Sequence, residues 1–147
     1  MPASPYAPSS YRLLVIDHER PILELLGELL VEEGVCATLV GTLSDALDLL
    51  DRECFDVILA DTLDRRTSAA AFDRWGALAA VKARAGTTPV LIFSAHPASA
   101  FVDAHERGFA GFIAKPFDLD ILTQTVRVCA ESGRYERQRA DATFAPA

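Results

Sequence analysis

Short runs of apolar residues alternate along the chain with segments in which apolar residues recur every three or four positions. Short uninterrupted apolar runs are typical of strands buried on both faces of a parallel sheet, whereas the three-and-four spacing is typical of amphipathic helices. The sequence therefore predicts strands and helices in alternation. The predicted strands are 12–16, 35–40, 55–60, 89–93 and 111–114.

Residues that favour helix starts and stops delimit the predicted helices. Pro21 lies in the first turn of the first helix, where a missing N–H costs nothing, and Gly34 ends that helix. Thr42 and Asp45 have the spacing of a capping box, with Asp in place of the more usual Glu. Helices are predicted over about 19–33, 43–50, 68–85 and 98–107, and a last one from Asp118.

Four of the predicted strands are followed directly by a polar side chain. These residues are Asp17, Asp61, Ser94 and Lys115. Alternating strands and helices build a parallel sheet with helices on both faces, and ligands bind such sheets at the carboxyl ends of the strands. A single Asp after a strand is more often a turn or cap residue. Four such residues together predict a pocket that holds two carboxylates, a hydroxyl and an ammonium.

The chemistry of this pocket follows from its donor groups. Carboxylate oxygens suit a hard divalent cation such as Mg²⁺, which also favours phosphoryl oxygens. A lysine can pair with an anionic group, and a hydroxyl can donate a hydrogen bond to it. The set therefore indicates phosphoryl handling, with one carboxylate as the nucleophile.

Length and composition narrow the setting of this pocket. The chain has 147 residues and a formal net charge of −7, which suits one domain and argues against binding to nucleic acid or anionic lipid. It has no apolar stretch of about 20 residues and no secretory signal, so we expect a cytoplasmic protein without membrane contact. The three cysteines form no CxxC pair and are expected to be reduced thiols. Residues 1–10 and 133–147 are expected to be a disordered N-terminal tail and a C-terminal tail.

Four motifs, in order, resemble those of the response-regulator receiver domain of bacterial two-component signalling. They are LVID at 14–17, DVILAD at 56–61, PVLIFSA at 89–95 and GFIAKPF at 111–117. We assign residues 11–132 to the receiver domain on this resemblance. It implies a flavodoxin-like α/β fold, a doubly wound five-stranded parallel sheet in the order 2-1-3-4-5 with five helices.

The resemblance also assigns roles to individual positions. It implies that Asp61 accepts a phosphoryl group from the phosphohistidine of a sensor histidine kinase or a phosphotransfer protein. Asp17 and the backbone carbonyl of Leu63 would join Asp61 in holding Mg²⁺. Lys115 would pair with the Asp61 carboxylate and then with the phosphoryl oxygens, and the Lys115–Pro116 bond would be cis.

The switch positions follow from the same resemblance. Ser94 would bond the phosphoryl group, and Phe112 would occupy the aromatic switch position. The surface of residues 98–130 would then contact an unknown downstream protein or a second copy of the chain. Because the receiver domain takes up nearly all of the residues, none remain for an output domain. We therefore expect a single-domain response regulator. It is expected to signal by protein contact and not to be an enzyme.

Three features depart from the family pattern. His18 stands where the family usually has a second acid, and imidazole prefers Zn, Cu, Ni or Fe to Mg²⁺. His18 therefore stays an open candidate as a metal ligand, Glu19 is a weak substitute for the missing acid, and Mg²⁺ is expected to bind weakly. The loop at 62–67 lacks the Pro and Gly that are usual in the family. Leu63 and His96 fall at two rim positions that, in the family, tune loss of the phosphoryl group.

These departures keep a second hypothesis open, a receiver-like scaffold that acts without phosphorylation. Asp61, Ser94 and Lys115 together favour the phosphorylated switch over the scaffold. No G-x-x-x-x-G-K-[ST] motif occurs, which excludes a nucleotide-binding P-loop. Trp75, at helical spacing from Leu78, is expected to contribute to packing.

Overall fold

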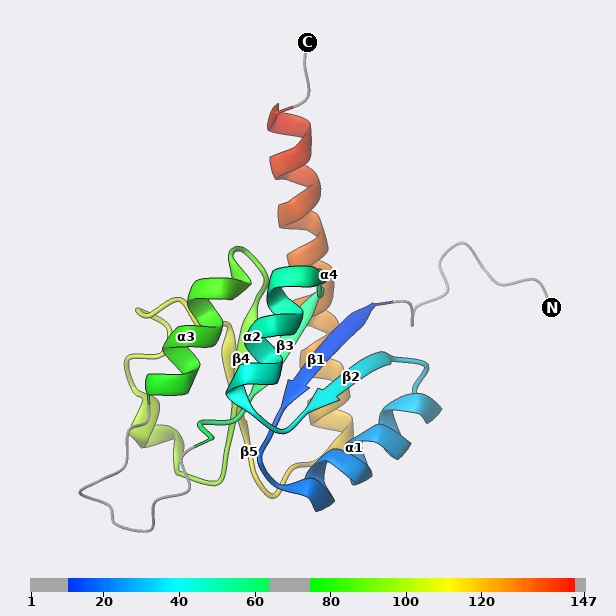
Figure 1. The fold of residues 1–147 in the computed structure, drawn as a ribbon, viewed down its shortest axis with the longest axis vertical. Coiled ribbons are helices and arrows are strands. Elements are labelled where there is room, and N and C mark those ends of the chain that lie inside the picture. The colour runs from blue at the N-terminus through cyan, green and yellow to red at the C-terminus, as the bar shows by residue number, and fades with distance from the viewer. Residues whose placement is uncertain (1–10, 64–74, 145–147) are drawn as a thin grey trace, which may run out of the picture.

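The computed structural model describes residues 11–63 and 75–144, with side chains as far as residue 132. Five parallel strands form one sheet in the order β2-β1-β3-β4-β5 (Figure 1), which confirms the predicted topology. Strands β1 and β3 are neighbours in the sheet, and the order of the strands reverses between them. Their carboxyl ends therefore lie side by side at the topological switch point, at one edge of the sheet. The strands are β1 (Arg12–Ile16), β2 (Cys36–Val40), β3 (Val57–Ala60), β4 (Val90–Ser94) and β5 (Gly111–Ala114).

Within residues 11–63 and 75–144, four α-helices cover both faces of this sheet. Their bounds are α1 (Arg20–Glu32), α2 (Leu43–Arg52), α3 (Gly76–Ala85) and α4 (Leu119–Phe144). Residues of α1 and α4 belong to one buried cluster, and residues of α2 and α3 belong to the other. The last turns of α4 extend past the sheet (Figure 1).

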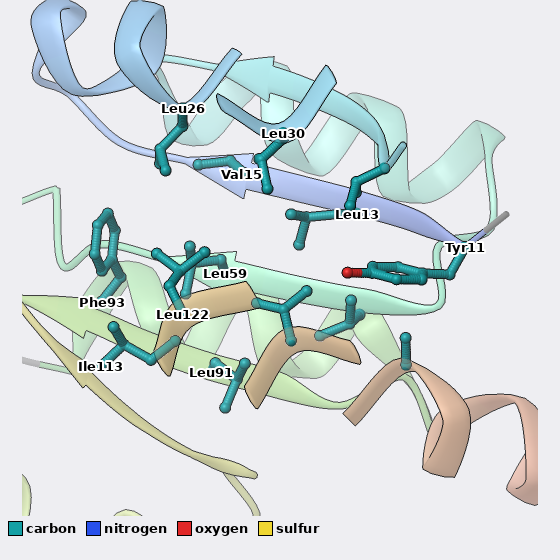
Figure 2. Packing of buried hydrophobic residues seen from close by; sticks show 14 residues of the cluster. Tyr11, Leu13, Val15, Leu26, Leu30, Leu59, Leu91, Phe93, Ile113 and Leu122 are labelled. Atoms are coloured by element: carbon teal, nitrogen blue, oxygen red, sulfur yellow. The ribbon is translucent and has the colours of Figure 1, made fainter. Parts of the chain in front are cut away.

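The three central strands β1, β3 and β4 read as uninterrupted apolar runs because both of their faces are buried. Leu13 and Val15 of β1 lie in one cluster with Leu26 of α1 (Figure 2), whereas Leu14 and Ile16 lie in the cluster on the opposite face. All four of these β1 residues are fully buried. The close packing of β1 therefore fixes the position of the residue that follows the strand.

The predicted signals at the ends of α1 and α2 are confirmed. Pro21 lies in the first turn of α1, and Gly34 has a φ of 74° just after the end of that helix. Thr42 caps α2, because its side-chain oxygen accepts a hydrogen bond from the backbone N–H of Asp45 at 3.1 Å.

The prediction of a helix over 98–107 is wrong, and the described residues form four α-helices where five were predicted. The structure has a 3₁₀-helix, η2 (Ala98–Phe101), followed by turns as far as Gly108. Within the 3₁₀-helix only Phe101 is buried, and the following Val102 is 82% exposed. Little tertiary packing therefore supports a regular helix here, and short helices depend on such packing.

The other two differences concern helix ends. The helix predicted from residue 68 begins at Gly76, with Trp75 as its N-cap, and residues 64–74 lie outside the described part of the chain. The last helix runs through Gly133 to Phe144, over residues that were expected to form the C-terminal tail. A glycine inside a helix costs only about 1 kcal/mol, and the Arg, Glu, Gln and Ala residues that follow it are good helix formers.

Candidate functional site

The carboxyl edge of the sheet brings together two carboxylates and an ammonium. Asp17 follows β1 and is fully buried, and Asp61 follows β3 and is 4% exposed. Lys115 follows β5 and reaches across β4, where its Nζ lies 4.8 Å from the centre of the Phe93 ring. The ammonium ends 2.5 Å from Oδ2 of Asp17 and 3.3 Å from Oδ1 of Asp61.

Ser94 ends β4 at the same edge and is 1% exposed. Its hydroxyl oxygen accepts a hydrogen bond from the backbone N–H of His96 at 3.0 Å. Its carbonyl accepts one from the backbone N–H of Lys115 at 2.9 Å, which joins β4 to the end of β5. The hydroxyl is therefore engaged by the loop that follows β4.

His18 is the nearest partner of the Asp61 carboxylate. The imidazole Nδ1 lies 2.6 Å from Oδ2 of Asp61 and 4.0 Å from Oδ1 of Asp17. Nitrogen–oxygen contacts as short as 2.6 Å are at the lower limit even of charge-assisted hydrogen bonds. The imidazole is 26% exposed, so it covers one oxygen of the buried carboxylate from the solvent side.

The turn after Asp61 places a second donor on the same oxygen. The backbone N–H of Leu63 donates to Oδ2 of Asp61 at 3.2 Å, and Leu63 has a φ of 60°. Leucine rarely adopts this left-handed conformation, so the hydrogen bond helps to hold a strained turn. Both oxygens of Asp61 therefore face nitrogen donors, Oδ1 facing Lys115 and Oδ2 facing His18 and Leu63.

The two oxygens of Asp17 differ in their surroundings. Oδ1 accepts a hydrogen bond from the backbone N–H of Glu19 at 2.8 Å. Oδ2 is buried and has the close ionic contact with Lys115, but no hydrogen bond of acceptable geometry reaches it. The side chain of Glu19 lies 3.4 Å from the Lys115 ammonium, which makes it a partner of the lysine.

Burial and ion pairing act in opposite directions on the pKa values of this cluster. Burial raises the pKa of Asp17, and the opposing effects of Lys115 and of the Glu19 N–H do not cancel that rise. Burial lowers the pKa of Lys115, but its contacts with Asp17 and Asp61 outweigh burial and raise the pKa overall. Lys115 is therefore held as an ammonium ion.

A sequence model of the response regulator receiver domain matches residues 13–127. The chain belongs to this family. Receiver domains are signalling modules of two-component systems, and their fold is the parallel sheet described above. Within residues 11–63 and 75–144 of this receiver, no helix combines the length and the apolar character needed to cross a bilayer.

The receiver is similar in sequence to parts of larger response regulators. It is 26% identical to the NtrX-like response regulator of Rickettsia bellii over 130 residues, which cover 88% of this chain and 27% of the relative. It is 31% identical to the DNA-binding transcriptional regulator NtrC of Proteus hauseri over 107 residues, 72% of this chain and 22% of the relative. The chain thus spans about a quarter of the length of these relatives.

Solved structures agree with this fold. NtrX from Brucella abortus in complex with ATP has a TM-score of 0.76 at 25% identity, over 90% of this chain and 30% of that one. The chemotaxis response regulator CheY4 of Vibrio cholerae has a TM-score of 0.66 at 20% identity, over 81% of this chain and 98% of that one. At such identity the second likeness shows the fold alone.

The donor set of this receiver differs from one suited to magnesium. Receiver domains generally bind Mg²⁺ at an acidic pocket, and Mg²⁺ takes oxygen ligands in near-octahedral geometry. Here Asp17, His18 and Asp61 each place one ligand atom within 4.8 Å of the other two, and one of the three is a nitrogen. Two carboxylates fit Mg²⁺ and the imidazole does not, so the three residues are a poor fit to a dedicated magnesium site. Metal binding by the carbonyl of Leu63 stays a prediction.

Phe112 lies in an aromatic cluster that packs against the second buried cluster. Its half-buried ring lies 5.5 Å, centre to centre, from that of Phe101. Trp75 lies 5.6 Å from Phe101 and 5.6 Å from Phe109, which confirms its packing role, and the Arg107 guanidinium lies 4.1 Å from the centre of the Trp75 ring. Phe109 is 4% exposed and belongs to the core. The switch role of Phe112 stays a prediction.

Sequence reasoning missed three contacts of this site. It gave Glu19 only the role of a replacement ligand, whereas its N–H and carboxylate contact Asp17 and Lys115. The signal was present, because an Asp at a strand end often accepts the N–H two residues later. The direct contact between His18 and Asp61 had no signal in the sequence, since it depends on side-chain direction across two strands.

Proposed function

We propose that this receiver accepts a phosphoryl group on Asp61 from the phosphohistidine of a sensor histidine kinase or a phosphotransfer protein. The observation that carries the proposal is the buried ammonium of Lys115, 3.3 Å from Oδ1 of Asp61 and paired with Asp17. A fixed ammonium in a water-poor pocket stabilises the charge that a phosphoryl group brings to the carboxylate. Asp61 is 4% exposed, so its carboxylate is almost fully shielded from water.

The transfer requires one oxygen of Asp61 to become available. That oxygen attacks phosphorus, the P–N bond to the donor histidine breaks with its electron pair going to nitrogen, and an acyl phosphate forms. His18 holds Oδ2 at 2.6 Å and Lys115 holds Oδ1 at 3.3 Å. His18 is the more exposed of the two side chains, 26% against 6%, so its outward rotation exposes the nucleophile at the lower cost. His18 therefore controls access to Asp61, and Mg²⁺ binds the pocket only weakly.

The output of the phosphorylated receiver is a change in protein contacts. Ser94 bonds the phosphoryl group after leaving the N–H of His96, and Phe112 moves against its neighbour Phe101 in response. The surface of residues 98–130 then binds a downstream protein or a second copy of the chain. A surface transmits the signal only if its contacts differ between the two states.

A receiver-like scaffold that never uses phosphate is the second candidate. The 2.6 Å contact between His18 and Asp61 favours it, because this contact covers an oxygen of the acceptor carboxylate. The scaffold would present the same surface permanently. The two candidates differ in whether Asp61 ever carries a phosphoryl group.

Intact-protein mass spectrometry after incubation with acetyl phosphate and a divalent cation separates the two candidates. The proposal predicts one phosphate adduct in the wild-type protein and none in Asp61→Asn. The matched control is Asp48→Asn, which changes an exposed carboxylate on α2 and keeps the adduct. No adduct in the wild-type protein at saturating phosphodonor would overturn the proposal and support the scaffold.

A further inference from the structure

Among the residues that the structure describes, the imidazole of His18 is the nitrogen donor beside the two carboxylates that comes neither from the backbone nor from the lysine. Its Nδ1 lies 2.6 Å from Oδ2 of Asp61 and 4.0 Å from Oδ1 of Asp17. We infer that Asp17, His18 and Asp61 form a site for a first-row transition-metal dication, such as Co²⁺, Ni²⁺ or Zn²⁺, in preference to Mg²⁺.

The types of ligand atom carry this selectivity. Imidazole nitrogen suits Zn, Cu, Fe and Ni, whereas Mg²⁺ takes oxygen ligands and gives up water reluctantly. Replacement of an acid by a histidine removes one favourable ligand for Mg²⁺ and adds one favourable ligand for the later metals. Two buried carboxylates supply the negative charge that either kind of ion needs.

The distances between the ligand atoms are close to those of a metal site. Transition-metal dications bind imidazole nitrogen and carboxylate oxygen at about 2.0–2.2 Å, which separates two ligand atoms by about 3 Å in cis and about 4 Å in trans. The 4.0 Å between His18 and Asp17 already fits this range. The 2.6 Å between His18 and Asp61 has to open by a few tenths of an ångström, which a rotation of the half-buried ring provides.

A second observation at the pocket points to a cation. Oδ2 of Asp17 is buried, and among the described side chains it is the buried polar atom that no hydrogen bond reaches. Within the described part of the chain, its ionic contact is with the Lys115 ammonium at 2.5 Å. Buried polar atoms normally have a hydrogen-bond partner, so this oxygen has unused capacity to bind an ion.

His18 also provides a path for the ion from solvent. Its side chain is 26% exposed and lines a cavity of about 270 Å³ beside the pocket. This space is large enough for the water molecules that would complete the coordination of a dication. The other residues that line the cavity are Gly41, Thr42, Leu43, Leu63 and Ala77.

Isothermal titration calorimetry with Co²⁺ and with Mg²⁺, in the absence of phosphodonor, tests the inference. Cys36 and Cys54 are exposed thiols, and thiolates are ligands that compete for Co²⁺, so every protein carries Cys36→Ser and Cys54→Ser. The test variants are His18→Asp, which restores the acid, and His18→Gln, which removes the imidazole without adding charge. The matched control is His105→Gln, which removes an exposed imidazole. The visible absorption spectrum of bound Co²⁺ reports its ligands independently of affinity.

We expect the ratio of the Mg²⁺ Kd to the Co²⁺ Kd to fall at least tenfold from the parent protein to His18→Asp. A tenfold change corresponds to about 1.4 kcal/mol. His18→Gln should weaken Co²⁺ binding and change its spectrum, and His105→Gln should do neither. An unchanged ratio in His18→Asp, or a Co²⁺ spectrum that His18→Gln leaves intact, would overturn the inference.

The inference goes beyond phosphoryl transfer, and the two can fail separately. Loss of the metal preference with an intact phosphate adduct on Asp61 would overturn the metal site alone. A metal preference that depends on His18, without any phosphate adduct, would overturn the proposed function alone.

Discussion

Replacement of His18 by aspartate is expected to make the stability of this receiver depend strongly on Mg²⁺. The substitution removes the 2.6 Å contact with Asp61 and places a third carboxylate beside two buried ones. A hydrogen bond to a charged group contributes about 1.5–3 kcal/mol. Repulsion between charges about 4 Å apart is at most about 4 kcal/mol near a protein surface, and the 26% exposure of this position reduces it. We therefore expect His18→Asp to lose about 2–4 kcal/mol of unfolding free energy in EDTA.

Added Mg²⁺ should reverse much of this loss. A ligand at about 100 times its Kd stabilises the folded state by about 2.7 kcal/mol, and at about 10 times its Kd by about 1.4 kcal/mol. If the restored acid tightens Mg²⁺ binding tenfold, the variant gains about 1.3 kcal/mol more than the wild-type protein at the same Mg²⁺ concentration. The same substitution should speed phosphorylation by acetyl phosphate, because it uncovers Oδ2 of Asp61.

Urea unfolding followed by circular dichroism, in EDTA and in Mg²⁺, measures both effects. His105→Asp is the matched control, since it places the same new charge at an exposed position away from the carboxylates. Equal gains from Mg²⁺ in the wild-type protein and in His18→Asp would refute the reasoning. So would a His18→Asp protein that is as stable as the wild-type protein in EDTA.

Three further predictions concern other parts of the receiver. Iodoacetamide should modify the exposed Cys36 and Cys54 before the half-buried Cys129, whose pKa is raised by burial; peptide mapping that found equal rates would contradict this. Burial raises the pKa of Tyr11 above its ordinary value of 10.0, so its contribution to stability is present below pH 10 and is lost as the pH rises further; Tyr11→Phe should flatten this part of the stability profile measured with urea. Addition of beryllofluoride should change amide hydrogen exchange across residues 98–130, and changes confined to other segments would contradict the proposed output surface.

The sheet could be predicted from the sequence because its signals are local. A strand buried on both faces is an uninterrupted apolar run, and the polar residue that ends it marks the carboxyl edge of the sheet. The apolar run of β1 ends at Asp17, and the apolar run of β3 ends at Asp61. The sequence therefore predicted which groups share a pocket before any distance was known.

The helices were harder to predict because their extent depends on packing. Phe101 and Ala104 have helical spacing, but the segment between β4 and β5 buries too few side chains to form a regular helix. The contacts within the pocket also depend on the packing of the whole sheet. The position of His18 predicted an altered metal site, but its direct contact with Asp61 depends on how two strand ends are aligned by the whole sheet.

The central claim is that Asp61, and no other carboxylate, becomes phosphorylated. Borohydride reduces an aspartyl phosphate to homoserine, so peptide mapping after incubation with acetyl phosphate and reduction identifies the acceptor directly. The account predicts homoserine at position 61 of the wild-type protein and its loss in Asp61→Asn. Homoserine at Asp17 or at another carboxylate, or none at position 61 under saturating phosphodonor, would contradict it.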